Sequence, residues 1–334
     1  MQGVLLCAGL LAVAVALAVI SGINDGGVLL APAVRYPVVP VGWFVAVLCL
    51  ALVSGPLLLG VSVARTLESG IFGGQDDTRS VFLIGVAVAL VVVLGLSRGG
   101  LPTSLTLALV GGLSGAAWGS GLGVAGGTVG KVLLIGAAAP TVGMLAGWLV
   151  GQLSRMRPAE RRRTGTFRAL HVTAFSLQCL AYAINDGQKM LAVAAVAVAA
   201  LPGAVAVLDS GNPGMLAAVS GTLMLLFCLG MLSSVRAVSG RIASGLAVLR
   251  PVDAISAQFV AAASVLASSA AGAPVSMTQA LAGGVVGAAG SKGMRRVRWD
   301  AAARIAGAWL VTLPASGTGA FAVAALVRYA GGAP

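Results

Sequence analysis

Apolar runs long enough to cross a lipid bilayer recur along the whole of this 334-residue sequence. A helix needs about 20 apolar residues to cross the roughly 30 Å hydrocarbon layer, where every backbone polar group must be hydrogen-bonded inside the protein. Ten segments have this character: 3–34, 39–64, 80–97, 101–120, 128–152, 169–202, 213–235, 254–271, 274–290 and 301–329. The pattern predicts an all-α polytopic membrane protein embedded in the lipid bilayer.

The distribution of charge predicts its orientation. Only 9% of the residues are charged, against about 25% in a soluble domain, yet the net charge is +12. If all ten segments cross, nearly all basic residues fall on one side: Arg35, Arg98, Arg155, Arg157, Arg161, Arg162, Arg163, Arg168, Arg236, Arg241, Arg250, Lys292, Arg295, Arg296, Arg298 and Arg304. The positive-inside rule then places both termini outside the cytoplasm in a multi-pass plasma-membrane protein. The basic charge reports topology, so we expect no nucleic-acid partner.

The two halves of the chain contain the same motifs in the same order. Ile-Asn-Asp-Gly at 23–26 returns at 184–187, and a Pro-initiated, hydroxyl-rich run at 102–106 returns at 274–278. We predict an N-terminal repeat at 1–152, a basic cytoplasmic linker at 153–168 and a C-terminal repeat at 169–334. Five segments per half is an odd number, so the second repeat is inverted. Interrupted helices at matching places of inverted halves indicate a transporter with its site near the bilayer midplane.

Asp25 and Asp186 are the buried charges of the two Asn-Asp pairs. A carboxylate at the centre of a membrane helix costs about 2.5–3.5 kcal/mol on insertion scales, so a bound partner is expected. Asn24 with Asp25 and Asn185 with Asp186, together with carbonyls freed by a break at Gly26 or Gly187, could coordinate sodium. A titrating proton is the alternative, and a purely structural role, such as capping a helix, is another. Lys189 could pair with Asp186 or with the substrate.

The hydroxyl-rich runs predict an anion site. Helix N-termini offer unpaired N–H groups and partial positive charge, and side-chain hydroxyls add further donors. The residues that fit this role are Thr103, Ser104, Thr106, Ser276 and Thr278. Two such re-entrant-type elements that meet from opposite sides would surround a small oxyanion.

The motifs resemble those of the inorganic phosphate transporter (PiT) family. The matching stretches are Gly22 to Asp25, Ala183 to Met190, Pro102 to Thr106, Pro274 to Thr278 and a C-terminal stretch from Arg304 to Pro314. The resemblance implies a phosphate symporter, commonly a homodimer, that is driven by a sodium or proton gradient. It adds Gln188 and Gln279 to the candidate site. The family histidine is replaced here by Leu107 and Gln279, and one hydroxyl of each run is replaced by Leu105 or Met277.

Two other functions remain open from the sequence. A sulfate permease of the same fold would use similar groups, and an ion channel or a non-transporting membrane subunit would need no occlusion elements. The sequence has no phosphate-binding loop with lysine, no metal cluster and no nucleophile beside a base, so we expect neither an enzyme nor a cofactor beyond the coupling ion.

Overall fold

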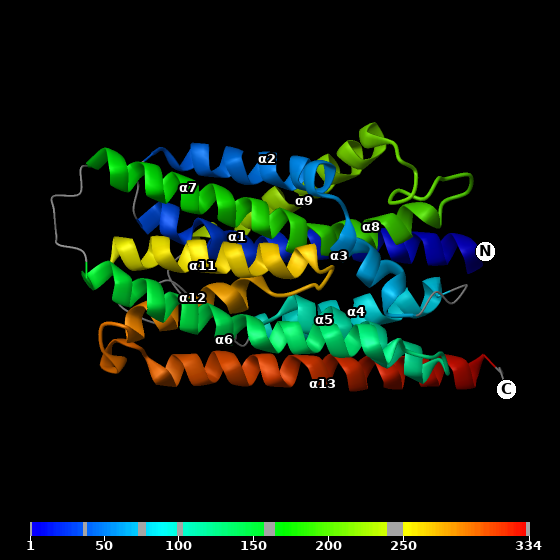
Figure 1. Cartoon of the computed structure of the whole chain (residues 1–334). Coiled ribbons are helices and arrows are strands. Elements are labelled where there is room, and N and C mark those ends of the chain that lie inside the picture. Colours follow the sequence, from blue (N-terminus) through cyan, green and yellow to red (C-terminus); the bar gives the residue numbers. More distant parts are fainter. Residues whose placement is uncertain are drawn as a thin grey trace.

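The computed structural model describes residues 2–35, 39–72, 78–98, 103–156, 164–238 and 250–331, and every element in these ranges is helical. The longer helices form one bundle (Figure 1). They are α1 (Gln2–Arg35), α2 (Val41–Leu59), α4 (Arg79–Arg98), α5 (Leu105–Gly119), α6 (Gly126–Met156), α7 (Thr164–Tyr182), α8 (Gln188–Ala199), α9 (Pro213–Val238), α11 (Pro251–Ala270), α12 (Met277–Gly290) and α13 (Trp299–Ala330). The short elements are α3 (Ser62–Arg65), the π-helical turns η1 (Thr66–Gly70) and η2 (Ala183–Gly187), and the 3₁₀ turn η3 (Met294–Arg296).

Within the described residues, seven helices are long and apolar enough to cross a membrane: α1, α2, α4, α6, α9, α11 and α13. Their outer faces carry exposed leucines, for example Leu58, Leu134 and Leu310, which are 74%, 73% and 77% exposed. Apolar side chains on the outside of a bundle of this kind face lipid. The prediction of an all-α polytopic membrane protein is confirmed.

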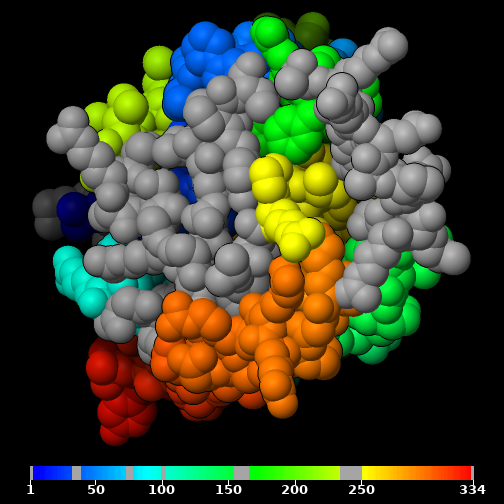
Figure 2. All heavy atoms as spheres, turned by 90° about the vertical axis from the view of Figure 1, so that its left-hand side faces the viewer, coloured from blue at the N-terminus to red at the C-terminus, as the bar shows by residue number. Residues whose placement is uncertain are grey.

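Both termini lie at the same end of the bundle (Figure 1). At the opposite end, α7, α11 and α13 begin, and the connection from α12 to α13 carries Lys292, Arg295, Arg296 and Arg298. Figure 2 shows this end, which we call the basic end, with the first turns of α11 in yellow and that connection in orange. The termini therefore share one side, as predicted, and their extracytoplasmic placement stays a prediction.

Helices α5 and α12 are too short to cross the bilayer. With 15 and 14 residues they span about 22 Å and 21 Å at 1.5 Å per residue. Each begins at a serine N-cap with nearly the same backbone angles, Ser104 (φ −103°, ψ 108°) and Ser276 (φ −103°, ψ 118°). The re-entrant-type elements predicted from the hydroxyl-rich runs are therefore present; Pro102 lies outside the described residues.

Glycines hold each of these two half-helices against a helix from the opposite half of the sequence. A Cβ at Gly115 of α5 would overlap the Gly317 carbonyl of α13, and a Cβ at Gly287 of α12 would overlap the Met144 carbonyl of α6. Small residues at this spacing allow membrane helices to approach closely. In the predicted repeat α6 corresponds to α13 and α5 to α12, so the two contacts are equivalent. This reciprocity favours the inverted repeat, which stays a prediction.

The predicted interruptions differ between the halves. Helix α1 runs through Asn24, Asp25 and Gly26 without a break, so the interruption expected there is wrong. In the second half the π-helical turn η2 covers Asn185 and Asp186 and joins α7 to α8. The predicted 153–168 linker is helical at both ends, because α6 extends to Met156 and α7 starts at Thr164; residues 157–163 lie outside the described ranges.

Candidate functional site

Asp25 lies in the middle of the bundle and receives hydrogen bonds from two side chains. It is 4% exposed. Asn24 Nδ2 donates to Asp25 Oδ1 at 2.8 Å, and the Tyr182 hydroxyl donates to Asp25 Oδ2 at 2.9 Å. Among the described residues no ion pair reaches Asp25. The site therefore holds a buried carboxylate that is hydrogen-bonded but has no cationic partner in contact.

Asp186 differs from Asp25 because it has a cationic partner. Lys189, which is fully buried, places Nζ 2.6 Å from Asp186 Oδ1. The same ammonium donates to Thr106 Oγ1 and to the Val275 carbonyl, both at 2.5 Å. Oδ2 of Asp186 is buried without a hydrogen-bond partner in the described structure. The three oxygens around Nζ are the kind of ligands that a bound metal cation would need, and Lys189 occupies that position.

The Lys189 contacts join the N-terminal ends of the two half-helices. Thr106 is the second residue of α5, and Val275 precedes the N-cap of α12. Thr106 also donates directly to the Val275 carbonyl at 2.8 Å. Residues that are 169 positions apart in the sequence therefore meet at one point. The N-terminal ends of both half-helices, with their partial positive charge, therefore lie beside the Lys189–Asp186 ion pair.

Asn185 fixes the chain that leads into α12. Its Nδ2 donates to Ser269 Oγ at 2.8 Å and to the Ala273 carbonyl at 3.4 Å, while its Oδ1 accepts from the Val275 amide at 3.1 Å. This side chain is fully buried. Asn185 lies within the π-helical turn η2, and its hydrogen bonds join this turn to α11 and to the chain that leads into α12.

Gln188 makes three hydrogen bonds to backbone groups. Its Oε1 accepts from the amides of Val63 and Ala64 at 2.8 and 3.1 Å, and its Nε2 donates to the Gly60 carbonyl at 2.6 Å. These bonds anchor α8 to the start of α3. They leave Gln188 engaged away from the half-helix N-termini, so the structure does not bring it to the anion candidates.

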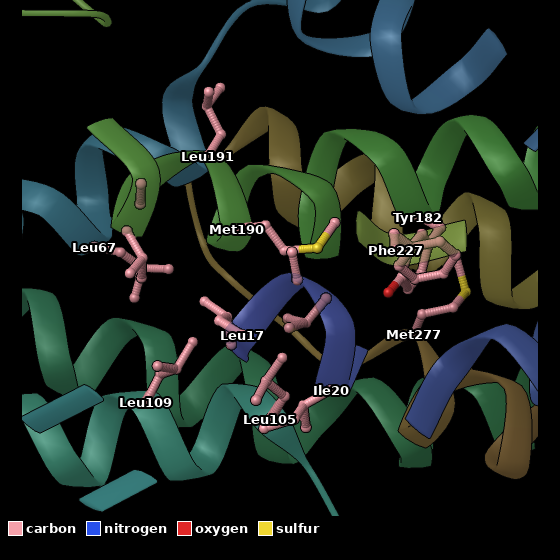
Figure 3. Packing of buried hydrophobic residues seen from close by; sticks show 14 of the residues in the cluster. Leu17, Ile20, Leu67, Leu105, Leu109, Tyr182, Met190, Leu191, Phe227 and Met277 are labelled. Carbon is pink, nitrogen blue, oxygen red and sulfur yellow. The ribbon is translucent and has the colours of Figure 1, made fainter. Parts of the chain in front are cut away.

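The hydroxyl residues surround the half-helix starts. Ser104 Oγ and Ser276 Oγ accept from the Leu107 and Gln279 amides at 3.4 Å, and Ser276 Oγ also lies 2.8 Å from Thr278 Oγ1. Thr103 Oγ1 is 3.5 Å from Ser97 Oγ. Leu105 and Met277, at the positions where the resembling family has hydroxyls, point into the apolar core (Figure 3).

Gln279 faces away from this cluster. Together with Leu107 it lines an apolar cavity of about 550 Å³ whose other walls come from α6 and α13. The structure thus brings together Asn185, Asp186, Lys189 and Thr106, and it keeps Gln279 on the lateral side of α12.

Two contributors were missed by reading the sequence. Tyr182 and Ser269 bond to Asp25 and Asn185, and both come from helix faces that look like ordinary buried surface. The one signal for Tyr182 is its place three residues before Asn185, where the first half has Ser21. No group of three or more His, Cys, Asp or Glu side chains able to hold a metal ion occurs in the described ranges, so any cation here would also need carbonyl, amide or hydroxyl oxygens.

Comparison with known proteins gives a consistent result. A family described as "Phosphate transporter family" matches residues 151–320. A "Probable low-affinity inorganic phosphate transporter" of Mycobacterium tuberculosis (strain ATCC 25618 / H37Rv) is 31% identical over 290 residues, which is 83% of this chain and 67% of that protein. A protein of the same name from Rhizobium meliloti (strain 1021) is 27% identical over 274 residues, 78% of each chain.

A solved structure called "The sodium-dependent phosphate transporter" superimposes with a TM-score of 0.79 and covers 98% of this chain and 100% of its own. The two sequences are 18% identical, so this likeness establishes the fold alone. These names give no support to the sulfate permease, channel or scaffold alternatives.

Proposed function

This chain belongs to the phosphate transporter family, and on that premise we propose that it carries inorganic phosphate across the plasma membrane as a gradient-driven symporter. It is a multi-pass membrane transporter and not an enzyme. The observation that carries the proposal is the meeting of two half-helix N-termini at Lys189, together with the buried carboxylate of Asp25, which has no cationic partner in the described part of the chain.

Phosphate binds, in this proposal, where α5 and α12 meet. Thr106, Ser104, Ser276 and Thr278 supply hydroxyl donors, Thr103 stands beside them, and Lys189 supplies positive charge. At neutral pH phosphate retains at least one proton, which it can donate to the unpartnered Oδ2 of Asp186. Sulfate has no proton to donate, so this oxygen favours phosphate.

The coupling cation binds at Asp25, and this assignment refines the symmetric expectation for the two Asn-Asp pairs. Lys189 already neutralises Asp186, whereas the partners of Asp25 among the described residues are two neutral donors, Asn24 and Tyr182. A sodium ion or a proton would compensate the charge of Asp25 in the loaded state. Departure of that cation would leave the carboxylate buried and uncompensated, which disfavours an empty, closed site. The binding of anion and cation is coupled because each ion lowers the electrostatic cost of placing the other in the buried site.

The test is uptake of radiolabelled phosphate into proteoliposomes under an imposed sodium gradient, a pH gradient or neither, with excess unlabelled sulfate in parallel. We expect uptake that one gradient accelerates and that sulfate does not block. Asp25→Asn should abolish the acceleration, because the neutral amide no longer attracts the cation. Gradient-independent uptake by the wild type would refute symport, and uptake by Asp25→Asn with the gradient response intact would refute the cation site.

The homodimer and the orientation of the termini remain part of the proposal. Cross-linking in native membranes tests the first. Labelling of Arg298→Cys, in a variant whose four native cysteines are replaced by serine, with a reagent that cannot cross the membrane, tests the second. The basic end should react only after the cells are opened.

A further inference from the structure

A pair of buried glutamines lies between the candidate site and the basic end. Gln178 of α7 and Gln258 of α11 are both fully buried. Gln258 Nε2 donates to Gln178 Oε1 at 2.7 Å, while Gln178 Nε2 and Gln258 Oε1 have no partner in the described structure. Turning both amides over reverses the bond and still leaves one N–H donor and one carbonyl acceptor free.

The pair stands in line with the candidate site. Gln178 precedes Asn185 by seven residues, which places it on the same face of the helix and about 10 Å nearer the basic end. His171, a further seven residues back, is also fully buried, and both of its ring nitrogens lack partners within the described residues. A buried polar stripe therefore runs along α7 from the basic end to the site.

At the corresponding described positions of the other half of the sequence the side chains are apolar. Helix α4 (Arg79–Arg98) and helix α11 (Pro251–Ala270) have equal lengths, 20 residues each, so Gln258 corresponds to Val86. By the spacing of the Asn-Asp pairs, Gln178 corresponds to Leu17 and His171 to Leu10, and all three counterparts are fully buried apolar residues. In an inverted repeat, equivalent positions lie on opposite sides of the midplane, so among these described positions the polar stripe belongs to the basic side of the site.

We propose that Gln178 and Gln258 form a second contact point for the transported oxyanion, on the route between the central site and the basic end. The free N–H donor binds phosphate oxygens and the free carbonyl accepts the phosphate hydroxyl. In the resting state the Gln178–Gln258 hydrogen bond closes α7 against α11, and the anion replaces that bond as it passes. Unsatisfied amide groups are costly in an apolar core, and contact with the anion would offset that cost at these two positions.

The inference rests on the proposed function, and the experiment separates the two. Phosphate uptake into proteoliposomes is compared for the wild type and for the double variant Gln178→Leu/Gln258→Val, which copies Leu17 and Val86. We expect the maximal rate to fall about tenfold, equivalent to about 1.4 kcal/mol of barrier, while the KM for phosphate changes less than about twofold, because the central site is intact.

Four further variants distinguish a loss of transport from a loss of folding. Gln178→Asn and Gln258→Asn keep a donor and an acceptor at each position and should retain most of the rate. Ser220→Ala, which removes another buried hydroxyl without a partner in the described structure, is the matched control and should leave the rate unchanged. The single variant Gln178→Met, close to glutamine in volume, gives the same comparison if the double variant fails to fold.

The outcomes are distinct. A wild type that takes up no phosphate overturns the proposed function and this inference with it. Equal rates for the wild type and the apolar variants overturn the inference alone. Equal losses in the asparagine and apolar variants, with a lowered melting temperature in detergent, assign the pair to packing and also overturn it.

Discussion

The pair formed by Asp186 and Lys189 predicts a specific pattern of stability losses. The two groups are 2.6 Å apart, with side chains 5% and 0% exposed. At an effective dielectric constant of about 20, charges at that distance attract by roughly 6 kcal/mol, most of which offsets the cost of removing them from water. Removing one partner leaves the other charge buried, so Lys189→Met should destabilise the protein by about 3–5 kcal/mol.

The double variant Asp186→Asn/Lys189→Met should be more stable than the sum of the single effects allows, because no uncompensated charge remains. We expect a coupling energy of about 2–3 kcal/mol from the double-mutant cycle. Asp186→Asn alone should cost less than Lys189→Met, since Lys189 keeps the Thr106 hydroxyl and the Val275 carbonyl as acceptors. The measurement is reversible unfolding in detergent micelles, monitored by intrinsic tryptophan fluorescence. Additive single effects would refute the buried ion pair.

Three further predictions follow from the described contacts. Gly287→Ala should destabilise the protein by about 1–3 kcal/mol, because the added methyl group would overlap a carbonyl of α6. Gly307→Ala is the control and should be neutral, because its methyl group would meet open space. The free energies of unfolding in detergent compare the two variants, and equal effects would contradict the packing. Asn185→Ala should lower the free energy of unfolding by about 1–3 kcal/mol, because the Val275 amide loses its acceptor. Hydrogen exchange of that amide should become faster, and unchanged protection would exclude this role for Asn185. Thr106→Val should raise the KM for phosphate uptake about tenfold, since it removes a donor at the half-helix junction, and an unchanged KM would remove Thr106 from the anion site.

The membrane fold could be predicted from the sequence because its cause is local. Each apolar run must become a helix in lipid, and the predicted segments at 80–97 and 254–271 fall within one to three residues of α4 and α11. The half-helices α5 and α12 could also be predicted, since Ser104 and Ser276 precede hydroxyl-rich turns that favour helix starts. The unbroken course of α1 could not be predicted, because an Asn-Asp-Gly sequence is compatible both with a continuous helix and with a helix break.

The partners of the polar residues could not be predicted, because they depend on how distant helices pack. Gln188 belongs to a motif that suggests ligand binding, yet its hydrogen bonds go to the backbone at Gly60, Val63 and Ala64, more than 120 residues away. Tyr182 had no sequence signal strong enough to mark it, although it bonds to Asp25 from the opposite half of the chain. Sequence reasoning identified which groups carry charge, and the packing decided which of them meet.

The difference between the halves is what gives this architecture a direction. A perfectly symmetric inverted repeat would place two equivalent carboxylates and two equivalent half-helices about one centre, and it would treat both sides of the membrane alike. Here Lys189 stands where the first half has Val28, and Tyr182 where it has Ser21. One carboxylate is therefore held by a fixed cation and the other by neutral donors. Because the charge beside Asp186 is fixed and the one beside Asp25 is exchangeable, binding of a single cation at Asp25 would control the net charge near the anion. Removal of Lys189 together with Asp186 should therefore weaken phosphate binding, while the response to the coupling cation at Asp25 persists.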